Sequence, residues 1–246
     1  FQELEFRQMK AQFDKLFGSG KEYDEIDSNG NTSEISQPVK KAPAKKSNED
    51  QFDLFGFSDE SDEPTANHSY YATLENTTHF YQIIQGDLPV KLLMQNLLNQ
   101  TSVCFDTETT GIDALNAELV GMSFSFEKGK GFYVPFPENQ EEAQTLIEKF
   151  RPFFENENIE KIGQNMKYDL KILSNYNIQV KGKLFDTMIA HYLINPDMRH
   201  NMDVLSETYL KYAPKSIETL IGKKGKNQLS MRDVPLEDIK EYATED

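Results

Sequence analysis

The chain has 246 residues, of which 41 are acidic and 26 are basic, so its formal net charge is −15 at pH 7. A chain this acidic is not expected to bind nucleic acid through a broad basic face; such binding would need cations or a few local basic residues. The single cysteine, Cys104, excludes an intramolecular disulfide, and its apolar neighbours predict a buried thiol in a reducing compartment. Neither a signal peptide nor an apolar run of 18 residues is present, so secretion and membrane insertion are not expected.

Two segments precede the main globular pattern, which occupies residues 70–246. Apolar side chains recur at near-helical spacing over residues 1–17, which predicts a helix that belonged to a preceding domain. Residues 18–69 contain too little apolar surface to offset chain entropy, so we predict a disordered acidic linker. Because the chain starts at Phe1 and stops inside a helical pattern, we expect a piece of a longer protein.

The elements of the globular segment follow from apolar periodicity. A helix at about 90–99 leads into a strand that contains Asp106. Further strands are expected at 118–126, 131–135 and 159–163, and helices at 138–155, 166–176, 187–194, 203–212 and from 235 to the end. A Lys-Gly-Lys-Gly turn at 128–131 joins two of the strands. This order of strands and helices indicates an α/β fold with a mixed sheet.

The most informative segment is Phe-Asp-Thr-Glu-Thr-Thr-Gly at residues 105–111. Residues two apart on a strand point the same way, so the carboxylates of Asp106 and Glu108 should lie side by side. Their repulsion should raise one pKa unless a cation neutralises them. Oxygen ligands favour hard cations such as Mg²⁺ or Mn²⁺. The alternative is an ordinary solvated pair of acids.

Two other places supply acids. Asp169 should lie one turn into a helix, at the carboxyl edge of the sheet, where α/β proteins place their chemistry. Its alternative role is to complement the helix dipole. Tyr242 and Asp246 are four residues apart on the last helix, so a phenol and a carboxylate share one face. Their alternative is a surface pair.

Three motifs in this order, at residues 105–111, 163–169 and 242–246, resemble the exonuclease motifs of the 3′→5′ proofreading domains of bacterial DNA polymerase I, the family A polymerases. The resemblance covers about residues 70–246, and residues 1–13 resemble the end of that family's preceding 5′-nuclease domain. It implies a ribonuclease H-like (DEDD exonuclease) fold with a mixed five-stranded sheet flanked by helices. It also implies hydrolysis of the 3′-terminal phosphodiester of DNA, with release of a nucleoside monophosphate.

The same resemblance implies roles for individual residues. Two divalent cations, Mg²⁺ or Mn²⁺, would be held by Asp106, Glu108, Asp169 and Asp246. The attacking water would be oriented by Tyr242 and Glu108. Positions that match substrate contacts of the family are Thr107, Ile112, Gln164, Asn165, Tyr168, Arg199 and Ile217.

Other polar residues have structural interpretations. Asn165 could cap a helix, and Arg199 could be an ordinary surface arginine. Asp186 repeats the Phe-Asp-Thr pattern without the glutamate, so we interpret it as a helix N-cap and not as a fifth ligand. His191 and His200 have no zinc-ligand partners, which favours structural roles for both.

Within the predicted linker, Gln51-Phe52-Asp53-Leu54-Phe55 resembles the peptide by which bacterial replication proteins bind the sliding clamp. Such a segment folds into a groove on binding and uses a few anchor side chains. We expect Leu54 and Phe55 to be the anchors and Gln51 to set the polar register. Alternatively, these apolar residues contact their own domain.

Taken together, the resemblance implies an exonuclease that acts on a single-stranded 3′ end and proofreads for a polymerase domain beyond residue 246. We expect a monomer in the bacterial cytoplasm, associated with the nucleoid and not with a membrane. One alternative is a catalytically silent scaffold that guides DNA or contacts partners; the retained carboxylates and Tyr242 argue against it. Another is an RNA-trimming relative, which the 5′-nuclease-like segment makes less favoured.

Overall fold

The computed structural model describes residues 71–225 and 227–245. The predicted helix at 1–17, the predicted linker at 18–69 with its clamp-like motif, and Asp246 all lie outside the described residues. Among the described helices, none has both the length and the apolar character that crossing a membrane requires.

A mixed sheet of six strands forms the centre of the domain, in the order β1-β4-β3-β2-β5-β6. The strands are β1 (Phe80–Ile83), β2 (Ser102–Thr109), β3 (Leu119–Glu127), β4 (Lys130–Pro135), β5 (Glu160–Gly163) and β6 (Leu184–Asp186). Strands β2, β3 and β4 pair antiparallel, whereas β1, β5 and β6 each pair parallel with a neighbour. The expected number of five strands was therefore wrong. The edge strands β1 and β6 are short and contain no buried residue, so they carry little periodic signal.

The helices are α2 (Asp87–Leu98), α3 (Gln140–Glu148), α4 (Arg151–Phe154), α5 (Lys167–Asn175), α6 (Thr187–Ile194), α7 (Met202–Leu205), α8 (Glu218–Ile221) and α9 (Leu236–Glu245). Shorter turns are η2 (Leu74–Asn76), the π-helical η3 (Ser206–Leu210) and η4 (Met231–Asp233).

Two predicted helices are interrupted. The segment 138–155 divides into α3, which Asn139 caps, and α4, which contains Pro152 in its first turn. Proline has no N–H to donate and is tolerated only in the first turn, so a new helix starts there. The segment 203–212 becomes α7 followed by η3, which ends at Lys211 in the left-handed conformation (φ 54°).

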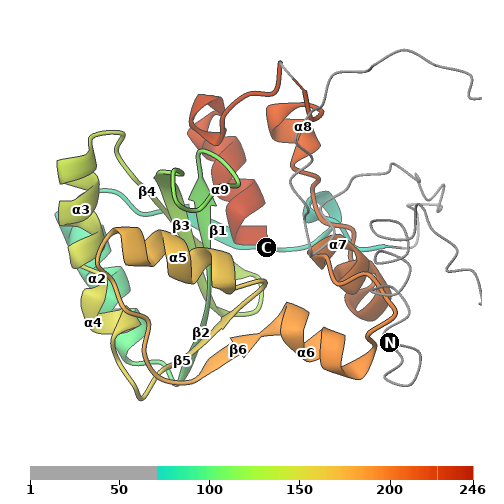
Figure 1. The fold of residues 1–246 in the computed structure, drawn as a ribbon, viewed down its shortest axis with the longest axis horizontal. Coiled ribbons are helices and arrows are strands. Elements are labelled where there is room, and N and C mark those ends of the chain that lie inside the picture. The colour runs from blue at the N-terminus through green and yellow to red at the C-terminus, as the bar shows by residue number, and fades with distance from the viewer. Residues whose placement is uncertain (1–70, 226, 246) are drawn as a thin grey trace, which may run out of the picture. The chain divides into compact units, whose positions relative to one another are not determined.

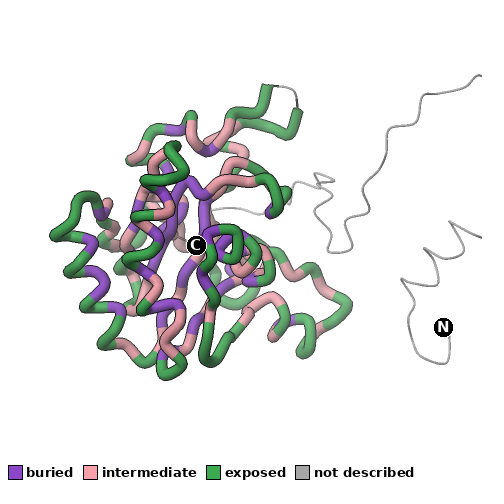
Figure 2. The backbone as a smooth tube through the Cα atoms, turned by 60° about the vertical axis from the view of Figure 1, so that its left-hand side comes forward, coloured by how far each residue is buried: buried purple, intermediate pink, exposed green. Residues whose placement is uncertain are grey.

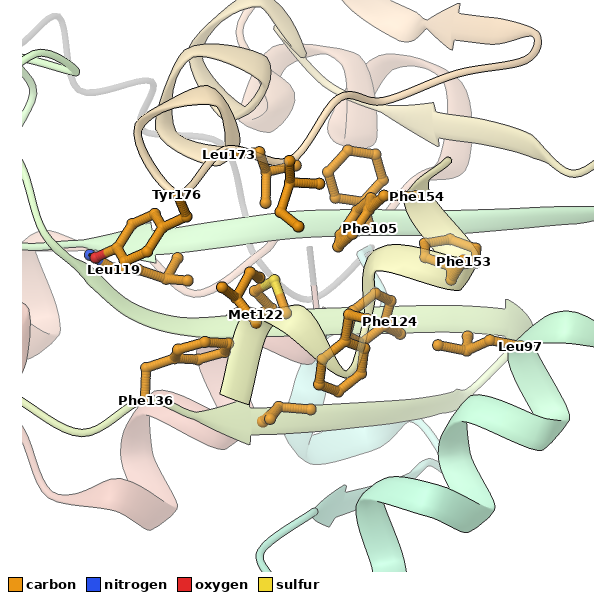
Figure 3. Close-up of a cluster of buried hydrophobic side chains, with 14 of the residues drawn as sticks. Leu97, Phe105, Leu119, Met122, Phe124, Phe136, Phe153, Phe154, Leu173 and Tyr176 are labelled. Carbon is orange, nitrogen blue, oxygen red and sulfur yellow. The ribbon is translucent and has the colours of Figure 1, made fainter. Parts of the chain in front are cut away.

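The larger hydrophobic cluster lies between one face of the sheet and helices α2 to α5. Figure 1 shows α2, α3 and α4 on one side of the strands and α9 on the other. At the centre, Phe124 stacks on Phe150 with ring centroids 5.4 Å apart. Phe124 also meets Phe153 edge-on at 5.7 Å, and both of these rings are labelled in Figure 3. In Figure 2 the buried segments follow the strands and the inward turns of the helices. Burial of these rings supplies the main stabilisation of the fold.

The opposite face of the sheet packs against α9 through a cluster of only six buried residues: Val120, Tyr133, Met231, Val234, Ile239 and Ala243. A Cβ placed on Gly131 would lie 2.8 Å from Cβ of Thr244, so the glycine lets α9 approach β4 closely. Cys104 points to this thinner side and is only partly buried, which corrects the expectation of a buried thiol.

Candidate active site

Strand β2 carries the first two acids. Its alternate residues Val103 and Phe105 enter the larger cluster, so Asp106 and Glu108 share the opposite face, on the α9 side. The sequence predicts that the two acids share a face but not which helix covers it. Asp106 pairs with Ser123 of β3, and the register shifts between Glu108 and Thr109. Such a bulge bends a strand and can redirect the side chains at its end.

Asp169 lies in the first turn of α5 and is 3% exposed. Its Oδ1 accepts hydrogen bonds from the backbone N–H of Thr107, at 3.2 Å, and from the Thr107 hydroxyl. Thr107 therefore holds the third acid against β2. In the described structure this threonine, which we expected to contact substrate, supports a carboxylate.

Burial in a low-dielectric site disfavours the charged form of a carboxyl group and so raises its pKa. Burial raises the pKa of Asp106 to about 6, although the Thr107 backbone N–H opposes the rise. Burial and then the charge of Asp106 raise the pKa of Asp169 well above its ordinary value. The repulsion expected between Asp106 and Glu108 therefore acts most clearly between Asp106 and Asp169.

The pKa of the Tyr168 phenol is affected by the acids that lie near it. Burial raises its pKa, and three nearby negative charges raise it further. These charges belong to Asp169, Glu108 and Asp106. The three predicted acids, which are far apart in sequence, thus share one neighbourhood around Tyr168.

The donor set fits hard divalent cations, because its ligands are all carboxylate oxygens and the charge of Asp106 raises the pKa of Asp169. Within residues 71–225 and 227–245, no three His, Cys, Asp or Glu side chains lie close enough together to hold an ion. Asp246, the fourth predicted ligand, lies outside the described residues. The described part therefore supplies the ligand chemistry but not a closed ligand set.

Asp186 organises the loop that precedes α5. As the N-cap of α6 it accepts hydrogen bonds from the N–H groups of Met188 and Ile189, which confirms its interpretation as a cap. The same carboxylate also accepts from the N–H groups of Asn165, at 3.2 Å, and Met166, at 2.9 Å. Asn165 is left-handed (φ 56°) and is not the cap of α5.

Two predicted substrate contacts make internal hydrogen bonds. The Gln164 side-chain N–H donates to the carbonyl of His200 at 2.6 Å, and its amide oxygen accepts from the Thr187 hydroxyl. The Tyr168 hydroxyl donates to the carbonyl of Gly111 at 2.5 Å. These contacts tie the loops around the acids together.

Comparison with known proteins identifies the family to which the chain belongs. A family model described as 3′–5′ exonuclease matches residues 81–246. The chain belongs to this 3′–5′ exonuclease family. DNA polymerase I of Borreliella burgdorferi is 33% identical over 206 residues, which cover 82% of this chain and 22% of the relative. DNA polymerase I of Pseudomonas aeruginosa is 31% identical over 175 residues, covering 68% and 19%. The chain spans about a fifth of the length of these relatives.

Solved structures support the fold of this exonuclease domain. Trypanosoma brucei RNase D, in complex with RNA U12, matches with a TM-score of 0.55 at 12% identity, over 67% of this chain and 58% of that one. The catalytic core of RRP6 from Trypanosoma brucei matches with a TM-score of 0.52 at 20% identity, over 69% and 46%. These similarities confirm the ribonuclease H-like fold class.

The remaining predicted substrate contacts of the exonuclease domain lie at its surface. Ile112 is 89% exposed, Ile217 is 40% exposed, and Arg199 is also exposed. His191 is buried and its Nδ1 lies 2.7 Å from Nδ1 of His200, so the two rings pack together. That contact accords with the structural roles expected for both histidines.

Sequence reasoning missed Tyr133 of β4. Its side chain is fully buried on the α9 side of the exonuclease domain, and its ring lies directly over Gly121 of β3. The only sequence signal is an aromatic residue on one strand opposite a small residue on the next. That signal becomes usable only when the register between the two strands is known.

Proposed function

We propose that this domain shortens DNA from its 3′ end, one nucleotide at a time, and releases nucleoside monophosphates. The hydrolysis would depend on two divalent cations, Mg²⁺ or Mn²⁺. The observation that carries the proposal is that Thr107, between Asp106 and Glu108 on β2, holds the Asp169 carboxylate by two hydrogen bonds, in a chain of the 3′–5′ exonuclease family. Because its relatives are named DNA polymerase I, we infer that it proofreads for a polymerase domain of a longer protein.

The acids would have two roles, which are to hold the cations and to direct the attacking water. Asp106, Glu108 and Asp169, together with Asp246, would hold the cations. When bound, such cations lower the pKa of a coordinated water and offset charge that develops on the phosphate. Glu108 would accept a hydrogen bond from the attacking water and so direct it. Tyr242, half-buried on α9, would help to orient the same water through its phenol.

The substrate contacts surround this centre. The exposed side chains of Ile112 and Ile217 would wedge against the terminal bases, and Arg199 would hold a phosphate. Gln164 and Asn165 would line the 3′ end from the loop before α5, beside Tyr168 and Thr107. Because the chain carries a net charge of −15, we expect DNA binding to weaken when divalent cations are chelated.

The parts outside the described residues complete the proposal. Residues 1–17 would end a 5′-nuclease domain, and residues 18–69 would link it to the exonuclease domain. We place the whole protein in the bacterial cytoplasm, associated with the nucleoid, and expect a monomer.

The linker would also dock on the sliding clamp through Gln51, Leu54 and Phe55. A labelled peptide of residues 47–60, titrated with clamp, tests this contact. We expect binding with a Kd of about ten micromolar, and replacement of Leu54 and Phe55 by alanine should abolish it. No binding of the unaltered peptide at about a hundred micromolar would remove the proposal.

Digestion of 5′-labelled single-stranded DNA and RNA in Mn²⁺ tests the activity. We expect a ladder of DNA shortened by single nucleotides from the 3′ end, with nucleoside monophosphates as products and slower cleavage of RNA. Binding of DNA without shortening would identify a silent scaffold. Faster cleavage of RNA would identify an RNA-trimming enzyme, and either result would contradict the proposal.

A further inference from the structure

Tyr133 carries a buried polar atom that the fold alone does not explain. The residue is 0% exposed, and among the described residues its hydroxyl has no hydrogen-bond partner. A buried hydroxyl without a partner is destabilising, so a phenylalanine would serve the packing at least as well. The presence of a tyrosine therefore calls for a function of its oxygen.

The position of that oxygen is set by Gly121. A Cβ on Gly121 would lie only 2.0 Å from the Tyr133 oxygen, which therefore occupies the space that a side chain would fill. Gly121 is the residue of β3 that pairs with Glu108 of β2. Adjacent strands lie about 4.8 Å apart, so the hydroxyl reaches across β3 toward Glu108.

The surrounding charges agree with this direction. Burial raises the pKa of the Tyr133 phenol, and the negative charge of Glu108 raises it further. The guanidinium of Arg232, on η4, acts in the opposite direction. The phenol is a hydrogen-bond donor placed over Gly121, whose strand neighbour Glu108 carries a carboxylate that can accept.

We propose that Tyr133 is a positioning residue for Glu108. When the site holds cations and the 3′ end of DNA, its hydroxyl donates a hydrogen bond to the Glu108 carboxylate. That bond fixes the orientation in which Glu108 directs the attacking water. This inference rests on the proposed function of Glu108. It also explains why position 121 is a glycine, because any larger side chain would displace the phenol.

Tyr133→Phe removes only the hydroxyl and keeps the ring in its cluster, so it separates positioning from packing. Tyr176→Phe is the matched control. Tyr176 is also a buried tyrosine, but it lies on the opposite face of the sheet and its hydroxyl accepts from the N–H of Leu119 at 3.0 Å. Both variants are compared with the unaltered full chain.

For Tyr133→Phe we expect kcat on single-stranded DNA to fall about tenfold, the effect of one lost hydrogen bond to a charged group, with KM unchanged. The Mn²⁺ concentration that gives half of the ion-induced rise in Tm should increase about threefold, and the metal-free Tm should be equal or higher. For Tyr176→Phe the metal-free Tm should fall, while kcat and the Mn²⁺ midpoint stay unchanged.

If Tyr133→Phe keeps kcat and the Mn²⁺ midpoint within about twofold of the unaltered chain, the inference is wrong. In that case, loss of activity in Glu108→Gln would show that the proposed function still holds. If the unaltered chain neither digests DNA nor gains stability from Mn²⁺, the proposed function and this inference fail together.

Discussion

The two faces of the sheet differ in what they bury. The face that packs against α2 to α5 buries a cluster of 24 apolar residues, centred on phenylalanine rings. The face that packs against α9 buries only six such residues and carries the carboxylates of Asp106 and Glu108 beside them. One face therefore supplies stability, which allows the other to hold charges that destabilise the fold.

This division explains how a small domain keeps carboxylates in a partly buried site. Burial of Asp106 is unfavourable, and packing on the other side of the sheet offsets it. Substitutions on the two faces should therefore have opposite effects on stability and activity.

The largest effect is expected for Asp106→Ala. Loss of a cation ligand should lower the rate of DNA digestion by about a thousandfold or more, while the metal-free Tm stays equal or rises, because a desolvated acid is removed. Digestion assays and thermal melts measure the two quantities. Glu127→Ala, at an exposed ion pair with Lys130, is the control and should leave both unchanged. Retention of more than about a tenth of the rate in Asp106→Ala would contradict the division.

Next in size is the effect of Phe124→Ala on the larger cluster. Deleting this ring, which contacts Phe150 and Phe153, should lower the free energy of unfolding by about 3–5 kcal/mol. Urea denaturation measures the change, and any folded fraction should digest DNA normally. Phe185→Ala is the matched control because that ring is 48% exposed, and we expect a loss of about 0.5 kcal/mol or less. Equal losses in the two variants would show that the cluster does not hold the fold.

The pH dependence of the chelated protein should report the charge on the α9 side. Burial raises the pKa of Asp106 from 3.8 to about 6, so the folded state holds this proton more tightly than the unfolded chain does. The stabilisation is full below about pH 4 and is lost as the pH rises through about 6, a loss of roughly 3 kcal/mol.

The loss is measured as the difference between the unfolding free energies of the chelated protein at about pH 4.5 and at about pH 7.5. Asp106→Asn has no ionisable group at this position, so its stability should fall less over the same interval. If the unaltered chain and Asp106→Asn lose the same amount, the Asp106 carboxyl is not the source.

A smaller effect is expected for Asp186→Ala. Its carboxylate caps α6 and the loop before α5, so we expect a loss of about 1–2 kcal/mol in unfolding free energy. The Mn²⁺ concentration that gives half-maximal stabilisation should not change, because Asp186 is a cap. Asp169→Asn, at a proposed ligand, is the comparison and should raise that concentration; an equally large rise for Asp186→Ala would make Asp186 a ligand.

The features that the sequence predicts correctly are those that depend on local sequence patterns. The acid pair of β2, the start of α6 at Asp186 and the hairpin between β3 and β4 follow from strand alternation, capping and glycine turns. The resemblance to the exonuclease motifs then predicts that Asp169 lies beside the acid pair. Each of these depends on a few consecutive residues.

The features that the sequence did not predict depend on tertiary placement. The edge strands β1 and β6 are too short to show an apolar period. The break between α3 and α4 was missed because the apolar spacing of the segment is compatible with one continuous helix. Cys104 is partly exposed because its face of β2 packs against the thinner cluster. Tyr133 could not be found without the pairing of β3 with β4, which sets its oxygen over Gly121.

A crystal of the chain soaked in Mn²⁺, with anomalous scattering recorded at the manganese edge, would locate the cations. We expect two peaks beside the carboxylates of Asp106, Glu108 and Asp169. Replacement of Asp106 by alanine should remove at least one of them. If no anomalous peak lies beside Asp106, Glu108 or Asp169 at a Mn²⁺ concentration that supports digestion, these acids do not hold the catalytic cations.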